Sequence, residues 1–432
     1  MPRVERIEKM ARGFSFIHCG DLHLGSPFRG IRTPDTRWQQ IISQATFRAF
    51  YQIIQQAIEK EADAVLICGD VYDSARHSLA AQLQYVRGLH RLVQAGIQVF
   101  VVHGNHDPLD SWDAKVPIPQ GVHVFGGDAP ERVPLIAGGE EVAAVYGQSY
   151  AYGDMRENLA KGYRREAKDR FSIGMLHCMA GSTEGHGKYA PCTLQDLQDA
   201  NMDYWALGHI HAHGMLQEEP PIVYSGNIQG LHRNETGPRG CYFVQVGPYG
   251  SVQTEFLDTA VIRWEQAEIS IDGLHTVEEL HQQVSAMKEA IRSEVRKPTF
   301  VYLTLTGAGD LHDTVSSREA LEAWQEAWIE EERGKYSFVM IEGIINQTKA
   351  PIDIEERSKL PDIVGDFLHV FDDISQLPED EQAKRLRAMI EEQPEWARLG
   401  SFGQQVSDSR LLRAFRQAKW EGTERLLGDK RA

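Results

Sequence analysis

The segment Phe14-Ser-Phe-Ile-His-Cys-Gly-Asp21-Leu-His23 joins an apolar run to two side chains of types that can bind metal ions. The run from Phe14 to Cys19 is short and rich in aromatic and β-branched residues, which predicts a strand. Carboxylate oxygens and imidazole nitrogens are ligands for divalent Mn, Fe or Zn. The segment therefore predicts a strand that ends in a metal-binding loop.

Four further blocks carry the same kinds of side chain. They are Gly69-Asp70, Gly104-Asn105-His106-Asp107, the lone His177, and Gly208-His209-Ile-His211. Apolar runs precede the first three of them, at 64–68, 97–102 and 171–176, and helical patterns span 38–59 and 79–95. This is βαβ order, in which ligands gather at the carboxyl ends of the strands. Further strand-like runs occupy 142–146, 204–207, 222–224 and 241–246.

The donor types define the chemistry. Oxygen and imidazole donors suit Mn, Fe or Zn rather than a thiolate site. Two metals ~3.5–4 Å apart are a standard device for in-line displacement at phosphorus. The five cysteines are odd in number and scattered, which predicts reduced core thiols in a cytosolic protein. A role in supporting neighbouring metal ligands, or as oxidation-sensitive thiols, stays open for Cys19, Cys68 and Cys178.

The ordered blocks resemble the signature D-x-H, G-D, G-N-H-[DE], H, G-H-x-H of calcineurin-like metallophosphoesterases, over roughly residues 14–213. The resemblance implies an α/β fold, a four-layer sandwich of two facing mixed β-sheets flanked by helices. It also implies two metal sites that share Asp70 as the bridging ligand. One would be held by Asp21, His23, Asp70 and His211, and the other by Asp70, Asn105, His177 and His209.

The residue His106 is not required as a ligand. Its position beside Asn105 suits a proton donor to the leaving oxygen or a stabiliser of the charged phosphorane. In related phosphatases the second Asp of a G-D-x-x-D motif orients this histidine, and Asp73 occupies that position here. An ordinary turn aspartate is the alternative for Asp73. For Asp107, a loop-capping role fits at least as well as a chemical one.

Other stretches indicate a branch of the family. Residues 17–30 and 224–240 resemble the DNA-repair exonucleases, namely the SbcD nuclease subunits and, more closely, their YhaO-like relatives. That resemblance implies a Mn-dependent DNA nuclease, with Fe, Zn or Mg as other possible metals. It also implies a homodimer that acts with an SbcC-like coiled-coil ATPase. Arg29 and Asn227 are the candidate substrate contacts.

The sequence predicts four regions. They are an N-terminal extension (1–13), the phosphoesterase domain (14–260), an α+β accessory domain (261–348) and a helical C-terminal region (349–432). The accessory domain is expected to hold strands at 299–306 and 336–342 after helices at 277–295 and 317–331. The last helix combines an apolar stripe with basic residues, which suits a partner's groove. Packing on the chain's own accessory domain is the alternative for this stripe, Leu411, Leu412, Phe415 and Trp420.

The formal net charge of −17 is unusual for a protein that acts on DNA. Either the basic residues are concentrated locally, as at 29–37 and 156–170, or a partner supplies much of the affinity. Solvated helix faces are the alternative for both stretches. The N-terminus has no secretory h-region and no stretch is long enough to span a membrane, so we expect a cytoplasmic protein. A small-molecule phosphodiesterase and a non-catalytic scaffold subunit remain alternative functions.

Overall fold

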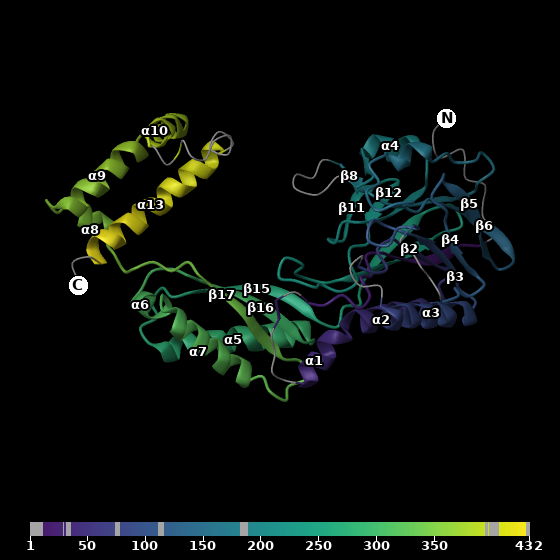
Figure 1. Ribbon diagram of the computed structural model, residues 1–432, viewed down its shortest axis with the longest axis horizontal. Coiled ribbons are helices and arrows are strands. Elements are labelled where there is room, and N and C mark those ends of the chain that lie inside the picture. The colour runs from purple at the N-terminus through teal and green to yellow at the C-terminus, as the bar shows by residue number, and fades with distance from the viewer. Residues whose placement is uncertain are drawn as a thin grey trace. The chain divides into compact units, whose positions relative to one another are not determined.

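The computed structural model (Figure 1) describes residues 12–28, 30–31, 36–73, 78–110, 116–181, 189–393, 396 and 406–428. The chain forms two compact units. The first comprises Met1–Gln266, Glu289–Tyr302 and Trp328–Glu342, and the second comprises Ala267–Lys288, Leu303–Ala327 and Gly343–Ala432. The domain boundaries after residues 260 and 348 stay a prediction. None of the described helices is long and apolar enough to cross a membrane.

Two six-stranded sheets make up most of the first unit. In the first sheet the order is β14 (Val252–Asp258), β13 (Gly240–Val246), β1 (Phe14–Cys19), β2 (Ala64–Cys68), β3 (Gln98–Val102) and β4 (Val122–Val124). In the second it is β11 (Gly214–Glu218), β12 (Pro221–Tyr224), β10 (Tyr204–Gly208), β7 (Ser172–His177), β6 (Glu140–Gly147) and β5 (Glu131–Ala137). Both sheets mix parallel and antiparallel pairs.

The two sheets share a buried core. Alternate side chains of each sheet, such as Phe16 and Phe100 on one and Ile173 and Tyr204 on the other, belong to this core. Their neighbours along the strands point outward, because successive residues of a strand face opposite sides. These outward residues pack under helices, so the predicted four-layer α/β sandwich is confirmed.

Helices cover the outer faces of both sheets (Figure 1). On the first sheet, Ile17 and Val65 pack with residues of α2 (Ala45–Glu59) and α3 (Leu79–Gln94). On the second, Leu176 and Trp205 pack with the 3-10 turn η2 (Leu159–Gly162) and α4 (Leu194–Asp199). The short pair β8 (Met179–Ala180) and β9 (Pro191–Cys192) lies in the same part of the chain.

The helix predicted over residues 38–59 is wrong in one respect, because the structure has two helices there. The first, α1 (Thr36–Ser43), ends at Ser43, and α2 begins at Ala45. The break separates two packing partners. Trp38 of α1 packs in a cluster with Phe28, Trp264 and Phe300, whereas α2 packs on the first sheet.

A third sheet has the order β15 (Arg263–Ser270), β16 (Thr299–Thr306) and β17 (Val339–Asn346). The sequence predicted β16 and placed β17 a few residues early, but β15 was not predicted. The helices of this part are α5 (Val277–Val295), α6 (His312–Val315) and α7 (Arg318–Glu330), and the C-terminal helices are α8 (Ile354–Ser358), α9 (Ile363–Ser375), α10 (Glu379–Glu391) and α13 (Asp408–Gly428).

The apolar stripe of α13 is largely covered by the C-terminal helices themselves. Leu411 and Leu412 are buried in a cluster with Ile374 of α9 and Leu386 of α10. Further along α13, the ammonium group of Lys349 lies over the ring of Trp420. The Lys349 Nζ atom is 4.9 Å from the ring centre. The stripe is therefore not an open groove-binding surface, since its own neighbours occupy most of it.

Replacing Phe50 with alanine tests the helix layer. Phe50 is 1% exposed between α2 and α3, so the cavity should lower the free energy of unfolding by ~3–5 kcal/mol. Chemical denaturation would measure this. As a control, Tyr249→Ala removes a side chain that is 65% exposed and should change stability by less than ~0.5 kcal/mol. Equal losses in the two variants would contradict the proposed layer.

Candidate metal centre

The predicted metal blocks lie at the carboxyl ends of five strands. These are β1, β2 and β3 of one sheet and β7 and β10 of the other. Two backbone hydrogen bonds connect the first loops: Asp21 N–H donates to Gly69 O (2.9 Å) and His23 N–H donates to Asp70 O (3.0 Å). In the other sheet, Gly208 pairs with His177. The topology therefore brings distant segments of the chain to one place.

The backbone is strained at these positions. Asp21, His23, Asp70 and His209 have φ values of 50°, 41°, 50° and 99°. This left-handed region is uncommon for residues other than glycine and clusters at functional sites. Four of the seven predicted ligands adopt it, so the loops are held in a conformation that the chain would not choose locally.

Glycines in the blocks allow a close approach. A Cβ on Gly104 would lie 2.3 Å from Asp70 Oδ1, and one on Gly208 would lie 1.8 Å from Cys68 O. Neither distance is possible without moving a loop. The Gly in each of these blocks is therefore required by packing around the centre.

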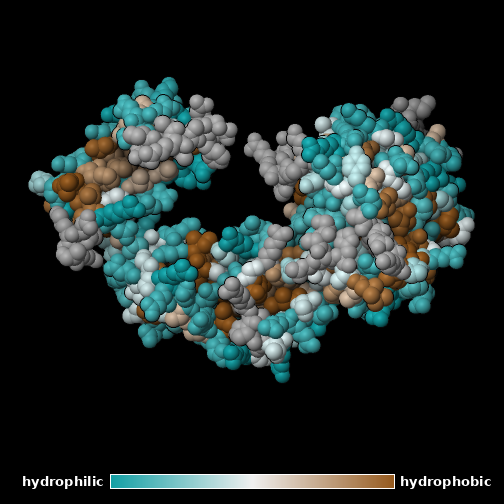
Figure 2. Space-filling view, in the orientation of Figure 1, coloured by the Kyte–Doolittle hydropathy of each residue, from teal (hydrophilic) through white to brown (hydrophobic). Residues whose placement is uncertain are grey.

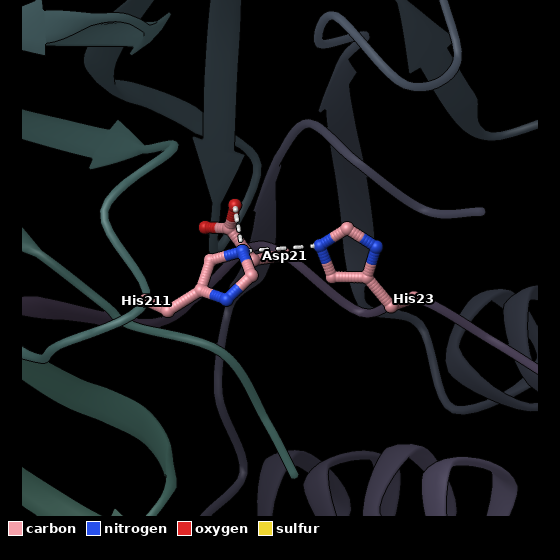
Figure 3. Close-up of side chains that lie close together, drawn as sticks. All are labelled: Asp21, His23 and His211. Atoms are coloured by element: carbon pink, nitrogen blue, oxygen red, sulfur yellow. Dashed lines mark hydrogen bonds and ion pairs between the residues drawn. The ribbon is translucent and has the colours of Figure 1, made fainter. Parts of the chain in front are cut away.

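One donor group consists of Asp21 and His23 from the loop after β1 and His211 from the loop after β10, and their side chains lie close together (Figure 3). The Nε2 atoms of His23 and His211 are 3.2 Å apart, and His211 Nε2 is 3.9 Å from Asp21 Oδ1. Two ring nitrogens and a carboxylate thus converge on one point, as ligands of a single cation would.

A second donor group adjoins the first. His177 Nε2 lies 3.0 Å from Asn105 Oδ1 and 3.4 Å from Asp70 Oδ2, and His209 Nδ1 lies 3.2 Å from Asn105 Oδ1. Asp70 Oδ2 is also 3.9 Å from His23 Nε2 in the first group. All seven predicted ligands therefore lie close together, and Asp21 also belongs to a group of converging donors with Asp70 and His177. The bridging role of Asp70 stays a prediction.

The charges at the centre suit divalent cations. Asp21 and Asp70 are 1% and 2% exposed, and their partners in the described part of the chain are imidazoles and backbone N–H groups. Burial raises the pKa of Asp21 to about 6. Burial also opposes ionisation of Asp70, but the neighbouring His177 holds the pKa of Asp70 well below its usual range. Buried carboxylates without lysine or arginine partners fit a site that takes up positive charge.

The cysteine thiols near the centre point elsewhere. Cys19 Sγ donates to Leu66 O at 3.5 Å, and Cys68 Sγ donates to Ala206 O at 3.4 Å. Cys178 Sγ lies 3.7 Å from Cys192 Sγ. The donor set is therefore oxygen and nitrogen, which suits Mn, Fe, Zn or Mg.

The side chain of His106 lies at the edge of the centre. The backbone N–H of His106 donates to Asp70 Oδ1 at 2.9 Å, and its ring Nδ1 lies 3.3 Å from Asp73 Oδ1. The two side chains are 38% and 28% exposed, so a substrate can reach them. This is the arrangement expected of an orienting carboxylate, and the catalytic roles stay predictions.

The loops are tied together by Asp107, which is fully buried. Its carboxylate accepts hydrogen bonds from the backbone N–H groups of Gly104 (2.8 Å), Asp70 (3.1 Å) and Val71 (2.9 Å). It also contacts His103 Nδ1 at 3.1 Å. These contacts correspond to the loop-capping alternative for Asp107.

Of the two candidate substrate contacts, Arg29 lies outside the described residues. Asn227 is 1% exposed, and its Oδ1 accepts a hydrogen bond from Arg239 (3.1 Å). Its backbone N–H donates to His211 O (3.1 Å), so Asn227 fixes the main chain of a predicted ligand. A direct contact with substrate stays a prediction.

The sequence did not assign a role to Glu235, which contacts His211 Nδ1 at 2.5 Å. Burial opposes its ionisation, but the hydrogen bond from His211 lowers the pKa of Glu235 to about 2. Residues 235–237 were part of the family resemblance, which gave Glu235 no role. Sequence spacing carried no other signal, because the contact depends on the path of a loop.

Comparison with known proteins agrees with this geometry. Residues 14–213 match the calcineurin-like phosphoesterase family, and residues 264–349 match the middle domain of the metallophosphoesterase YhaO. The chain is 35% identical to the metallophosphoesterase YhaO of Bacillus subtilis over 367 residues, which cover 84% of this chain and 88% of that protein.

More distant relatives are DNA double-strand break repair proteins named Mre11. The protein of Thermoplasma acidophilum is 26% identical over 65% of this chain and 74% of its own length. The Mre11 protein of Methanopyrus kandleri is 23% identical over 78% of this chain and 74% of its own length. The fold and the donor set thus define a metal-dependent phosphoesterase, a hydrolase related to the Mre11 proteins. The chain belongs to the YhaO-like family of calcineurin-like metallophosphoesterases.

The variant Asp70→Ala tests the bridging position. Because Asp70 Oδ2 faces imidazoles of both donor groups, its loss should remove both metals and essentially all phosphoesterase activity. Elemental analysis of the purified variant would measure the metals. Asp73→Ala, which alters a carboxylate outside both donor groups, should keep them. Two tightly bound metals in Asp70→Ala would contradict the assignment.

Proposed function

We propose that this protein is a dinuclear phosphodiesterase, a Mn-dependent DNA nuclease that acts with an SbcC-like ATPase. The observation that carries the proposal is the position of Asp70 Oδ2, within 4 Å of His23 Nε2 and of His177 Nε2. A carboxylate shared by two donor groups is suited to two cations held side by side. Two such cations supply Lewis acidity to the attacking and leaving oxygens of an in-line displacement.

The protein's own residues would complete the reaction. Asp73 Oδ1 lies 3.3 Å from His106 Nδ1 and would accept its proton, which would orient the ring with Nε2 toward the substrate. His106 would then protonate the leaving oxygen or stabilise the charged phosphorane. Asn105, His177 and His209 would hold one cation, and Asp21, His23 and His211 the other.

The choice of DNA rests on the Mre11 relatives and on a local concentration of positive charge. The stretch 156–170 contributes little, because Arg165 pairs with Asp203 (2.7 Å), Arg156 with Asp154 (2.9 Å) and Lys168 with Glu166 (2.9 Å). Solvated helix faces stay the alternative for this stretch.

A second candidate for DNA contact is a cavity of about 550 Å³ in the first unit, although two of its cations are also paired, Arg333 with Glu330 (2.8 Å) and Lys335 with Glu332 (3.0 Å). Its lining includes Arg37, Arg333, Lys335 and Tyr336, whose ring is 77% exposed. Cationic side chains can neutralise phosphates, and an exposed aromatic ring offers a surface on which a base can stack. This combination is suited to a single strand near the phosphoesterase domain.

One assay separates the proposed function from its alternatives. The purified protein with Mn would be tested on labelled single- and double-stranded DNA and on bis(p-nitrophenyl) phosphate. Cleavage of DNA at rates well above those for the small diester supports the nuclease. Cleavage of the small diester alone indicates a small-molecule phosphodiesterase, and no cleavage of either substrate indicates a scaffold subunit.

The variant His106→Ala tests the chemical step. If His106 acts on the leaving group, the variant should keep both metals while turnover falls by ~10²–10⁴. Elemental analysis and steady-state kinetics on the small diester would measure the two effects. His177→Ala is the comparison, because this residue belongs to the second donor group. Metal loss equal to that of His177→Ala would show that His106 is a ligand.

The C-terminal helices are the proposed site for the ATPase partner. Although the stripe of α13 is covered, α9 exposes Ile363 (64%) and Val370 (51%), and Figure 2 shows hydrophobic surface over α8 and α9. A chain ending near residue 350 should remain folded and hydrolyse a small diester at a near-normal rate. It should no longer co-purify with an SbcC-like ATPase.

A point variant makes this test independent of the truncation. Ile363→Asp in the full chain should weaken binding of the ATPase without changing turnover of the small diester. Tyr249→Asp, at an equally exposed position of the first unit, is the matched control. If the truncation loses small-diester turnover or its melting transition, the helices stabilise the chain itself and the docking proposal fails.

A further inference from the structure

The carboxylate of Glu235 is buried beside a proposed metal ligand. It lies in the loop between β12 and β13 and is 5% exposed. One oxygen, Oε1, contacts His211 Nδ1 at 2.5 Å, and the other, Oε2, accepts a hydrogen bond from Leu231 N–H at 2.7 Å. Both oxygens are therefore engaged, so the carboxylate has a fixed orientation.

The ring of His211 needs such a contact. The His211 side chain is 35% exposed, whereas His177 is fully buried and His23 is 7% exposed. Packing alone therefore fixes the His211 ring less than it fixes the other two. A hydrogen bond to Nδ1 is what determines the direction in which Nε2 points.

Hydrogen bonds also fix the backbone of His211. Its carbonyl oxygen accepts hydrogen bonds from Asn227 N–H (3.1 Å) and from the Arg239 guanidinium. Arg239 in turn donates to Asn227 Oδ1 at 3.1 Å. Main chain and ring are thus fixed by separate groups, and Glu235 acts on the Nδ1 atom of the ring.

The loop that carries Glu235 is itself anchored on β15. Trp264 Nε1 donates to Gly230 O (3.1 Å), and Gly237 N–H donates to Trp264 O (3.0 Å). The side chain of Gln229 accepts hydrogen bonds from Val261 N–H (3.0 Å) and Ile262 N–H (3.1 Å). The carboxylate therefore reaches His211 from a rigid support.

We propose that Glu235 is a positioning residue, which fixes the Nδ1–H tautomer of His211 and aims its Nε2 lone pair at the first donor group. This inference rests on the proposed dinuclear function. A carboxylate that accepts the second N–H of a metal-binding histidine orients the ring and raises its basicity as a ligand. The expected consequence is tighter binding of one of the two cations.

The variant Glu235→Gln tests this directly in the full chain. Glutamine keeps the size of the side chain but has one fewer acceptor and no negative charge. Titration calorimetry with Mn²⁺ should show one of two sites weakened by ~10–100-fold, the range typical of such partners, and the other unchanged. The melting temperature of the metal-free protein should stay the same.

Two controls separate positioning from a general structural effect. His232 lies 3.3 Å from Glu235 Oε1 without belonging to a donor group, so His232→Ala should leave both affinities unchanged. In a His211→Ala background, adding Glu235→Gln should alter neither the affinity of the remaining site nor the melting temperature, because the ring on which Glu235 acts is gone.

The outcomes are distinguishable. Equal weakening of both sites by Glu235→Gln, a further loss in the His211→Ala background, or no change at all would overturn the role of Glu235. A wild-type protein that binds fewer than two Mn²⁺ ions would overturn the proposed dinuclear function instead. Two bound ions with one selectively weakened site would support both.

Discussion

The parallel pairing of β1, β2 and β3 is the constraint on which the metal centre depends. Cys19 pairs with Ile67, and Cys68 pairs with Val102, so the three strands end almost level. The loops that follow start at one edge of the sheet, and Asp21 and Asp70 therefore meet. Because both faces of these strands are buried, a slip of one residue would move the whole apolar set to the wrong face, and the register is strongly specified.

The scaffold maintains two unfavourable features at this edge. Asp21, His23, Asp70 and His209 adopt left-handed backbone conformations, each of which costs on the order of 1–3 kcal/mol. In addition, two carboxylates are buried. Such features persist only where the surroundings determine them, and here the fully buried Asp107 bonds three N–H groups of neighbouring loops. The donors are thus arranged by the folded chain before any cation binds.

The sequence predicted elements well where local pattern and tertiary partner agree. β1 and β2 begin and end as predicted, because each is an apolar run with a core on both faces. The break at Gln44 was not predictable, since the amphipathic pattern continues through it while the packing partner changes. β15 was missed because polar residues such as Glu265, Gln266 and Glu268 interrupt its apolar positions irregularly. The ligands were predictable because each sits in a short motif, whereas the contact of Glu235 with His211 depends on the path of a loop.

The C-terminal helix shows a further limit of pattern reading. An amphipathic stripe indicates that a face will be covered, but it does not identify what covers it. In α13, Leu411 and Leu412 are covered by Ile374 and Leu386 of neighbouring helices. The apolar surface left over lies on α9, whose sequence did not stand out. A partner surface has to be inferred from what the folded helices leave exposed.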